Sequence, residues 1–355
     1  MSRFKTTYQL IFVLVMGIVC SQNAHSYDII SALPADPIIP EDNPLTPEKV
    51  ALGKKLFFDA RLSLDGTVSC NSCHHLMSGG DDDGAVNQMA NRNINRSAPS
   101  VWNVAYMSTL YWDGRAKSLE SQTVDHLLDP NIMQMGSPQA VEARLNAIPG
   151  YVAEFNQTFG ENALTISNIS NAIASFERTL KTPNSPFDQF IKGDENALNA
   201  AAKRGYHEFI EVGCMSCHFG VNFAGPAPGP AFKMGDGFYE LFPNYLGSQY
   251  DDKYDLTSDI GRYQVSLENI HKYMWRVPPM RNVMLTAPYF HNGSVKDIAE
   301  AVRVMGLVQL KKQLSEQQVK DIIAFLESLT GEFPEIAMPR LPDTPGQSLI
   351  PDLAQ

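Results

Sequence analysis

The sequence is short of positive charge and has no long apolar run. Its 355 residues include 28 lysines and arginines against 39 aspartates and glutamates, which gives a formal net charge of −11 at pH 7. Such an acidic chain is unsuited to the phosphate backbone of nucleic acid, although it would attract a basic protein partner. The most apolar stretch, residues 10–20, is shorter than the ~20 residues that a membrane-spanning helix needs. We therefore predict no nucleic-acid binding and no membrane span in the mature chain.

The N-terminus has the composition of a secretory signal peptide. Arg3 and Lys5 precede the apolar stretch, and residues 24–26 (AHS) match the small-residue site that signal peptidase cuts. We expect residues 1–26 to be removed and the mature protein to be periplasmic. A retained membrane anchor is the alternative.

Alternating apolar and polar residues, the pattern of half-buried strands, are also scarce. Apolar residues at helical spacing occur instead, with a capping residue before several of these segments. Residues 62–103 and 220–262 are predicted to be mostly loop. The sequence therefore predicts an all-α, loop-rich fold. The predicted helices begin at Thr46 and Ser315 and cover residues 117–128, 138–147, 166–180 and 197–211.

Cysteines are few, and their arrangement carries the chemistry. Cys20 lies in the signal peptide. The other four form two C-x-x-C pairs, each followed directly by a histidine: Cys70, Cys73 and His74, and Cys214, Cys217 and His218. One helical turn places two thiols under the vinyl groups of a porphyrin, and the next residue points its imidazole at the iron. The sequence therefore predicts two covalently bound haem c groups with His74 and His218 as axial ligands.

A zinc site or a redox-active dithiol is the alternative for these cysteines. Zinc ribbons separate their pairs by ~15–20 residues, far fewer than separate the pairs here, and a thioredoxin-like site needs a βαβ context. Two haems by themselves indicate only electron transfer. The group at the second axial position decides between a relay and a catalyst, because an open or labile site can bind peroxide.

The two motifs occupy similar settings, each after a predicted helix and before a long loop. This indicates a duplicated module. We predict an N-terminal haem domain at residues 27–190, a C-terminal haem domain at 191–335 and a C-terminal tail at 336–355.

Five further motifs surround the cysteines, and their order and spacing are specific. With them the chain resembles, over roughly residues 45–332, the bacterial dihaem cytochrome c peroxidase family, which also includes MauG-like dihaem enzymes. The resemblance implies two cytochrome c-like domains and the reduction of hydrogen peroxide with electrons from a small periplasmic cytochrome or cupredoxin. The motifs are LFFDARLS (56–63), YWDGR (111–115), RVPPMRN (276–282), TAPYFHNG (286–293) and VMGLVQL (304–310).

The resemblance also implies roles for individual residues. Met305 matches the methionine that completes the coordination of the C-terminal, electron-accepting haem. The protein-oxidising relatives have a tyrosine there, so Met305 favours a peroxidase. Trp112 matches a tryptophan between the two haems. Thr286 and Pro288 match residues whose backbone carbonyls help to bind calcium, although Ser97 stands where the family's third calcium residue is an asparagine.

Two departures from the family concern the N-terminal haem. No histidine lies between His75 and Ser97, where the family has a loop histidine on the iron. Met89 falls at that spot, so either Met89 is a sixth ligand or the site is open. Gln134 stands where the family has a glutamate that moves the peroxide proton. Glutamine can orient peroxide but cannot exchange a proton, so we expect a slower peroxidase.

The last predictions concern the positions of two further histidines and the alternative functions. We expect His126 on a polar helix face, with a position facing the N-terminal haem as the alternative, and His291 near the C-terminal haem. A MauG-like oxidase that modifies a partner protein is favoured by the missing loop histidine and by Gln134, and opposed by Met305. A non-catalytic dihaem electron-transfer cytochrome is the other alternative. The family includes dimers, so a homodimer stays open.

Overall fold

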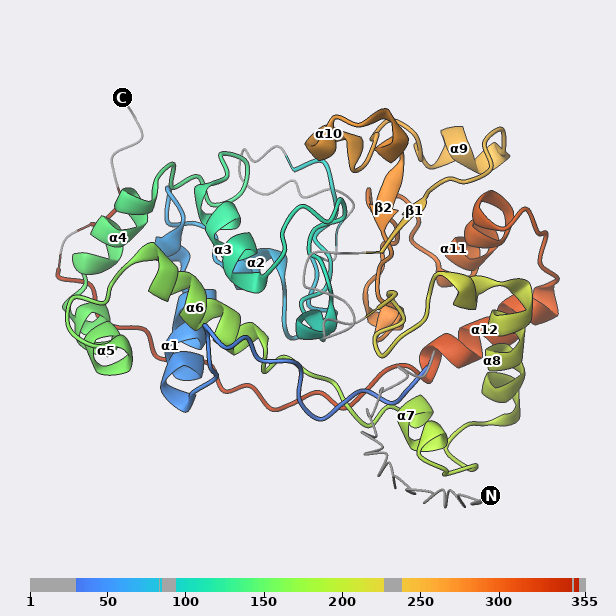
Figure 1. The fold of residues 1–355 in the computed structure, drawn as a ribbon, viewed down its shortest axis with the longest axis horizontal. Coiled ribbons are helices and arrows are strands. Elements are labelled where there is room, and N and C mark those ends of the chain that lie inside the picture. The colour runs from blue at the N-terminus through green and yellow to red at the C-terminus, as the bar shows by residue number, and fades with distance from the viewer. Residues whose placement is uncertain (1–29, 83, 85–93, 227–237, 347, 351–355) are drawn as a thin grey trace, which may run out of the picture.

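The computed structural model describes residues 30–82, 84, 94–226, 238–346 and 348–350. The described part is rich in helix and poor in strand, as the sequence predicts, and its elements form two lobes along the long axis (Figure 1). The main helices are α1 (Pro47–Phe58), α3 (Leu119–Leu128), α4 (Pro138–Asn146), α5 (Pro149–Phe159), α6 (Ile166–Glu177), α7 (Pro186–Ile191), α8 (Ala200–Val212), α11 (Ile298–Val304) and α12 (Glu316–Glu327).

Short elements lie between these helices and carry both cysteine motifs. β1 and β2 pair antiparallel, with Glu240 opposite Trp275. The short elements are η1 (Ala60–Leu62), α2 (Cys70–Cys73), η2 (Val104–Tyr106), η3 (Cys214–Ser216), β1 (Tyr239–Leu241), α9 (Gln249–Lys253), α10 (Tyr263–Ser266), η4 (Asn269–His271), β2 (Met274–Arg276), η5 (Val283–Leu285) and the π-helical turn η6 (Met305–Gln309).

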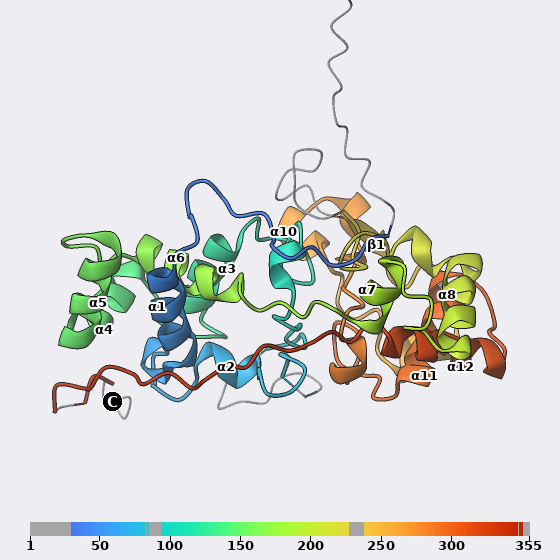
Figure 2. The ribbon, with the colours of Figure 1, turned by 90° about the horizontal axis from the view of Figure 1, so that it is seen from below.

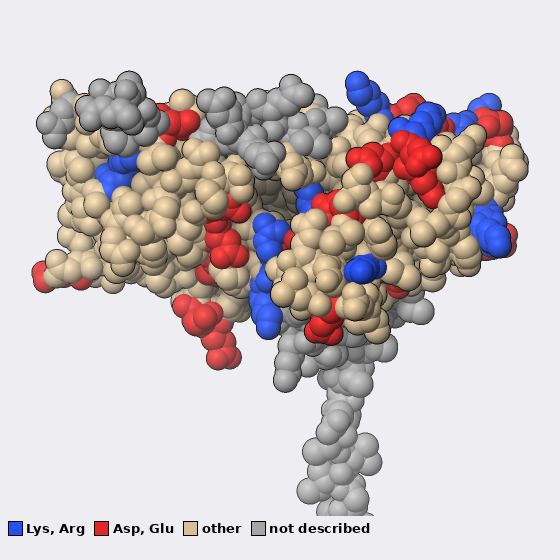
Figure 3. Space-filling view, turned by 90° about the horizontal axis from the view of Figure 1, so that it is seen from above, with Lys and Arg blue, Asp and Glu red and all other residues tan. Residues whose placement is uncertain are grey.

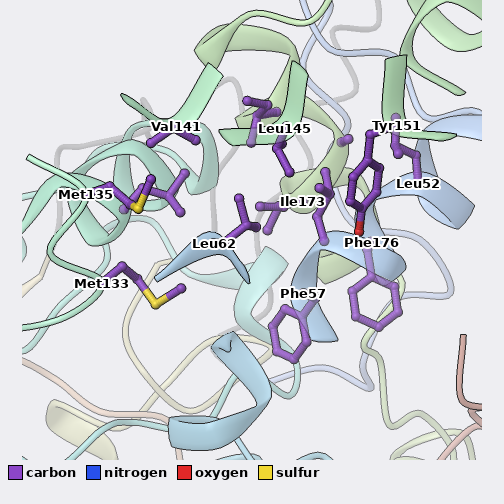
Figure 4. Packing of buried hydrophobic residues seen from close by; sticks show 14 of the residues in the cluster. Leu52, Phe57, Leu62, Met133, Met135, Val141, Leu145, Tyr151, Ile173 and Phe176 are labelled. Carbon is purple, nitrogen blue, oxygen red and sulfur yellow. The ribbon is translucent and has the colours of Figure 1, made fainter. Parts of the chain in front are cut away.

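The N-terminal lobe is built on the crossing of α1 and α6. Thr46 caps α1 by accepting a hydrogen bond from the backbone of Lys49. Gly53 allows the two helices to touch, because a Cβ there would lie 1.8 Å from the carbonyl oxygen of Ala172. Aromatic and aliphatic side chains from α1, α4, α5 and α6 fill the core beside this contact, as Figure 4 shows.

The C-terminal lobe repeats this construction with α8 and α12. Gly205 of α8 allows the close approach, since a Cβ there would lie 1.7 Å from the carbonyl oxygen of Asp321. Phe187, Phe209 and Phe325 pack edge-on or tilted in the core beside it. In both lobes, the helix that precedes the cysteine motif packs through a glycine onto the last helix of the lobe. This repetition agrees with the duplicated module that the sequence indicates.

Long segments without helix tie the two lobes together, as Figure 2 shows for the chain before α1 and after α12. The segment after α12 returns to the N-terminal lobe, where Phe333 packs edge-on against Trp102 and the carbonyl of Pro342 accepts from Arg61. Within the C-terminal lobe, Arg281 and Asp188 form an ion pair at 2.8 Å with both side chains fully buried. The domain limits at 190 and 335 stay a prediction.

Within the described ranges, no helix combines the length and apolar character needed to cross a bilayer. The predicted helices appear within a few residues of their expected limits, while α5 and α7 were not predicted. The predicted signal peptide lies outside the described residues.

Candidate haem-binding sites

The C-terminal cysteine motif opens onto a cavity with largely apolar walls. Gly213 ends α8 with a φ of 107°, a left-handed conformation that suits glycine, and the chain turns directly into the motif. Cys214, Cys217 and His218 all line this cavity, and so does Met305. The structure therefore brings the predicted attachment site and the predicted sixth ligand to one space.

His218 has the features of a metal-binding histidine. It is 8% exposed, and its Nδ1 lies 3.0 Å from the carbonyl oxygen of Phe223. A carbonyl only accepts, so Nδ1 carries the proton and Nε2 is left unprotonated in the neutral ring. Burial lowers the pKa of His218, which keeps the ring neutral. Such a carbonyl partner fixes the tautomer of a histidine ligand.

Met305 reaches the cavity because the helix changes character at this residue. The α-helical chain of α11 ends at Val304 and continues as the π-helical turn Met305–Gln309. π-helical turns are rare and are often found at functional sites. Gly306 packs closely against Leu314, with an added Cβ falling 2.9 Å from that side chain.

The N-terminal motif has the same arrangement around His74. The short helix α2 begins at Cys70 with a reciprocal cap between Ser69 and Ser72. His74 is 8% exposed, and its Nδ1 donates to the carbonyl oxygen of Pro99 at 3.1 Å. Burial lowers the pKa of His74 to about 4, so the ring is neutral and its Nε2 can bind iron.

The thiols fit attachment better than redox chemistry. The four cysteines of the described chain are not paired as disulfides. Burial raises the pKa of the Cys214 thiol to about 12 and that of Cys70 still further, whereas reactive dithiols have lowered values. Among the described residues, no group of three or more histidine, cysteine, aspartate or glutamate side chains is placed to hold a metal ion. Both observations argue against the dithiol and zinc alternatives.

His126 lies opposite His74, which is the alternative that the sequence left open for it. The favoured prediction, a polar helix face, is wrong. The structure instead half-buries it, with its ring 16° from parallel to that of His74 and the centroids 6.3 Å apart. Burial, with smaller effects from His74 and Arg115, lowers the pKa of His126 to about 3.

Gln134 lies in the turn that follows α3. Its φ is 63°, and its backbone N–H donates to the carbonyl oxygen of Asp129 at 2.9 Å. On either side, Met133 donates to His126 and Met135 to Leu127 through their backbones. The turn thus folds back onto the end of α3, next to His126. Met89 lies outside the described residues.

Trp112 sits where the two sites meet. Its indole N–H donates to the carbonyl oxygen of Ser97 at 2.8 Å, two residues before the Pro99 carbonyl that binds His74. Trp112, Ser97 and Pro99 also line the C-terminal cavity. One short stretch of backbone therefore contacts the N-terminal histidine, the tryptophan and the C-terminal cavity.

Known proteins place the chain in a family. A family model described as di-haem cytochrome c peroxidase matches residues 47–196. The cytochrome c551 peroxidase of Pseudomonas aeruginosa is 40% identical over 307 residues, which cover 84% of this chain and 83% of that protein. The chain belongs to the di-haem cytochrome c peroxidase family. It is therefore an oxidoreductase that acts on peroxide, and the resemblance in its motifs is confirmed.

Proteins with the MauG name are also similar to this peroxidase-family chain. The methylamine utilization protein MauG of Methylorubrum extorquens is 35% identical, covering 85% of this chain and 84% of that protein. A crystal structure of a MauG-like protein associated with microbial copper homeostasis matches with a TM-score of 0.71 at 27% identity. That match covers 87% of this chain and 96% of the other.

The predicted calcium residues of this family member all line the C-terminal cavity. They are Ser97, Thr286 and Pro288. The Ser97 hydroxyl donates to Asp82 at 3.2 Å, and the Ser97 backbone N–H donates to the carbonyl of His291 at 2.8 Å. Asp82 thus places a carboxylate where the sequence analysis considered only a serine. Calcium binding stays a prediction.

His291 lies beside the same cavity, as expected. It is 2% exposed and stacks on Trp275 at 4.1 Å between centroids. Burial lowers its pKa to about 4. The sequence analysis missed the partners that fix both proximal histidines, the carbonyls of Pro99 and Phe223, because a backbone carbonyl has no signature in the sequence.

Proposed function

We propose that this protein is a periplasmic peroxidase with two covalently attached haem c groups and that a small cytochrome or cupredoxin is its electron donor. In the reaction, hydrogen peroxide accepts two electrons and two protons, its O–O bond breaks, and two water molecules form. The Trp112–Ser97–Pro99–His74 connection supports this best, because it links a site suited to receiving electrons with a second histidine site.

The residues that would hold the haems have suitable chemistry. Cys70 and Cys73 would attach one group, and Cys214 and Cys217 the other. Bound there, the haems supply electron transfer and the reactive iron. His74 and His218 offer neutral imidazoles whose orientation is fixed by carbonyl oxygens. Each attached haem with its cysteines and histidine would form the centre of one cytochrome c-like domain.

The two sites would differ in their second axial ligand. Met305 would offer a thioether in the cavity that His218 also lines, and methionine with histidine raises the reduction potential. That suits acceptance of electrons from a donor protein. Trp112, held by Ser97 between the sites, would lie on the electron path to the His74 side.

Peroxide would be oriented and protonated near the end of α3. Gln134 can donate and accept hydrogen bonds and so can orient peroxide, but its amide does not exchange protons near neutral pH. Water or Asp129, whose backbone carbonyl binds Gln134, would bring the protons. Calcium held by Ser97, Thr286 and Pro288 would strengthen the contact between the lobes.

The donor is proposed from charge rather than from a visible docking patch. The chain has a net charge of −11, which favours a basic donor protein. Acidic and basic side chains are interspersed over the face in Figure 3, with no single patch of one sign. A homodimer and the export signal at residues 1–26 belong to the same proposal.

Oxidation of a partner protein's side chain is the second candidate. The similarity to MauG and the presence of Gln134 in place of a glutamate favour it. Steady-state assay with hydrogen peroxide and a reduced small cytochrome c separates the two. A peroxidase should oxidise two cytochromes per peroxide over many turnovers, whereas one or two turnovers followed by arrest would overturn the proposal.

A matched control uses the N-terminal thiols. The double variant Cys70→Ser, Cys73→Ser should lose one covalent haem by mass spectrometry and keep the other. It should still accept electrons from the reduced cytochrome but should not turn over peroxide. Sustained turnover by this variant would contradict the assignment of the peroxide site.

A further inference from the structure

His126 and His74 face each other across a gap. His126 lies in the last turn of α3, and its ring is nearly parallel to that of His74 at 6.3 Å between centroids. His74 directs Nδ1 at the carbonyl of Pro99, so its Nε2 is on the other edge of the ring and available to a metal. These two imidazoles come from segments more than fifty residues apart, and the fold brings them together.

The separation suits two imidazoles that share one metal ion. Metal–imidazole bonds are about 2 Å long, and a ring nitrogen lies roughly 1 Å from its ring centre, so opposed ligands place their centroids about 6 Å apart. Rings in direct face-to-face contact would lie about 3.5–4 Å apart. The observed gap is therefore too wide for face contact and wide enough for one iron.

His126 is held firmly but its ring nitrogens are free. Tyr111 packs edge-on against it at 5.0 Å between ring centroids, and the Arg115 guanidinium stacks on the Tyr111 ring at 3.4 Å from its centroid. The His126 carbonyl accepts from Met133, which fixes the backbone. Within the described part of the chain, neither ring nitrogen of His126 makes a hydrogen bond. A metal bond would give this half-buried ring a partner within the protein.

We propose that His126 is the second axial ligand of the N-terminal haem, on the face opposite His74, and that it closes this site in the resting oxidised protein. This inference rests on the proposed haem at Cys70 and Cys73. It supplies the histidine that the segment between His75 and Ser97 lacks, from a different element of the fold. Peroxide would then gain access only when His126 leaves the iron.

The site would open through a movement of His126 at the end of α3. Ser118 caps the start of that helix with a reciprocal bond to Ser121, and Leu119 and Leu127 are buried, so the helix as a whole is anchored. His126 lies two residues before the end of α3, where the chain continues into the Gln134 turn. Rotation of its side chain, or a small opening of this last turn, would expose the iron without moving the lobe.

The test is the ferric spectrum of the mature holoprotein, by absorption and electron paramagnetic resonance. We expect the wild type to be low-spin at both irons. His126→Ala should convert one iron per molecule to high spin, and added imidazole should restore low spin. His126→Gln, which keeps a polar side chain of similar reach, should also be high-spin. Unchanged spectra in both variants would overturn the inference.

Controls separate this inference from its rivals. His75→Ala removes an exposed histidine next to His74 and should leave the spectrum of the wild type. Met89→Ala should do the same, and conversion to high spin by that variant alone would identify Met89 as the ligand instead. Mass spectrometry counts the haems in each variant. If the wild type carries no porphyrin at Cys70 and Cys73, the proposed function itself fails.

Discussion

Trp112 donates its indole hydrogen to the carbonyl oxygen of Ser97 at 2.8 Å, in the same stretch of backbone whose Pro99 carbonyl orients His74. The two residues are fifteen positions apart in the chain, and their bond holds the tryptophan, which lines the cavity of the C-terminal lobe, next to the backbone that orients the histidine of the N-terminal lobe.

Replacement of Trp112 by phenylalanine tests the electron path. The ring is retained but the bond to Ser97 is lost, so we expect a loss of stability of about 0.5–1.5 kcal/mol. Peroxide turnover should fall, while reduction of the C-terminal haem by the donor should proceed at the wild-type rate. Stopped-flow absorption separates these steps.

Trp102→Phe provides the comparison. Trp102 is buried in the N-terminal core against Phe333 and does not line the cavity. It should cost stability without slowing turnover. Equal turnover in the Trp112 and Trp102 variants would remove Trp112 from the path.

Met305→His tests the ligand of the electron-accepting site. An imidazole in place of the thioether should lower the reduction potential of the C-terminal haem by about 0.1 V or more, within the ~0.8 V range that axial ligands span. Spectroelectrochemical titration measures this change. Met338→His alters an exposed methionine, 72% accessible, and should leave both potentials unchanged. A wild-type potential in the Met305 variant would show that another residue is the ligand.

Gln134→Glu tests whether the lack of a proton-exchanging side chain at this position limits the reaction with peroxide. A carboxyl group at this turn can exchange a proton, and such help is worth ~10²–10⁴-fold where it is well placed. We expect kcat/KM for peroxide to rise roughly tenfold or more and to gain a dependence on pH near the ordinary glutamate pKa of about 4.3. Gln139→Glu adds the same charge at an exposed position of α4 and should have no such effect. A Gln134 variant with unaltered kcat/KM would place the proton transfer elsewhere.

The sequence predicts what depends on local chemistry. The cap at Thr46 and the reciprocal cap of Ser315 with Gln318 appear in the structure as expected, because a few neighbouring residues decide them. The cysteine and histidine motifs are recognisable for the same reason. His126 could not be placed in this way, since helical periodicity alone does not show which face of α3 meets the N-terminal motif.

Close backbone contacts between helices could not be predicted from the sequence either. Gly53 and Gly205 read in the sequence as ordinary helix residues, yet each permits the helix crossing on which its lobe is built. The carbonyls of Pro99 and Phe223 orient the two proximal histidines without any side-chain signature. These features follow from the packing of distant segments, which only the three-dimensional structure supplies.

Glu177 leads to a prediction about pH. It is 6% exposed at the end of α6, and among the described residues its Oε2 has no hydrogen-bond partner. Burial raises its pKa to about 8, with Arg178 acting in the opposite direction. The folded protein thus keeps a proton that the unfolded chain, with a glutamate pKa of 4.5, releases. Its contribution is fully present below pH 4.5 and is lost as the pH rises through 8.

Glu177→Gln should therefore match the wild type in stability at pH 4 and exceed it at pH 9. Each unit of pKa difference corresponds to ~1.4 kcal/mol, so the advantage at pH 9 should reach a few kcal/mol. Urea unfolding of the holoprotein at both pH values measures it. Glu161→Gln, at an exposed site in the same lobe, removes the same charge and should show no such pH-dependent gain. If the two variants responded alike, the buried carboxyl would not be the group that makes this fold sensitive to alkaline pH.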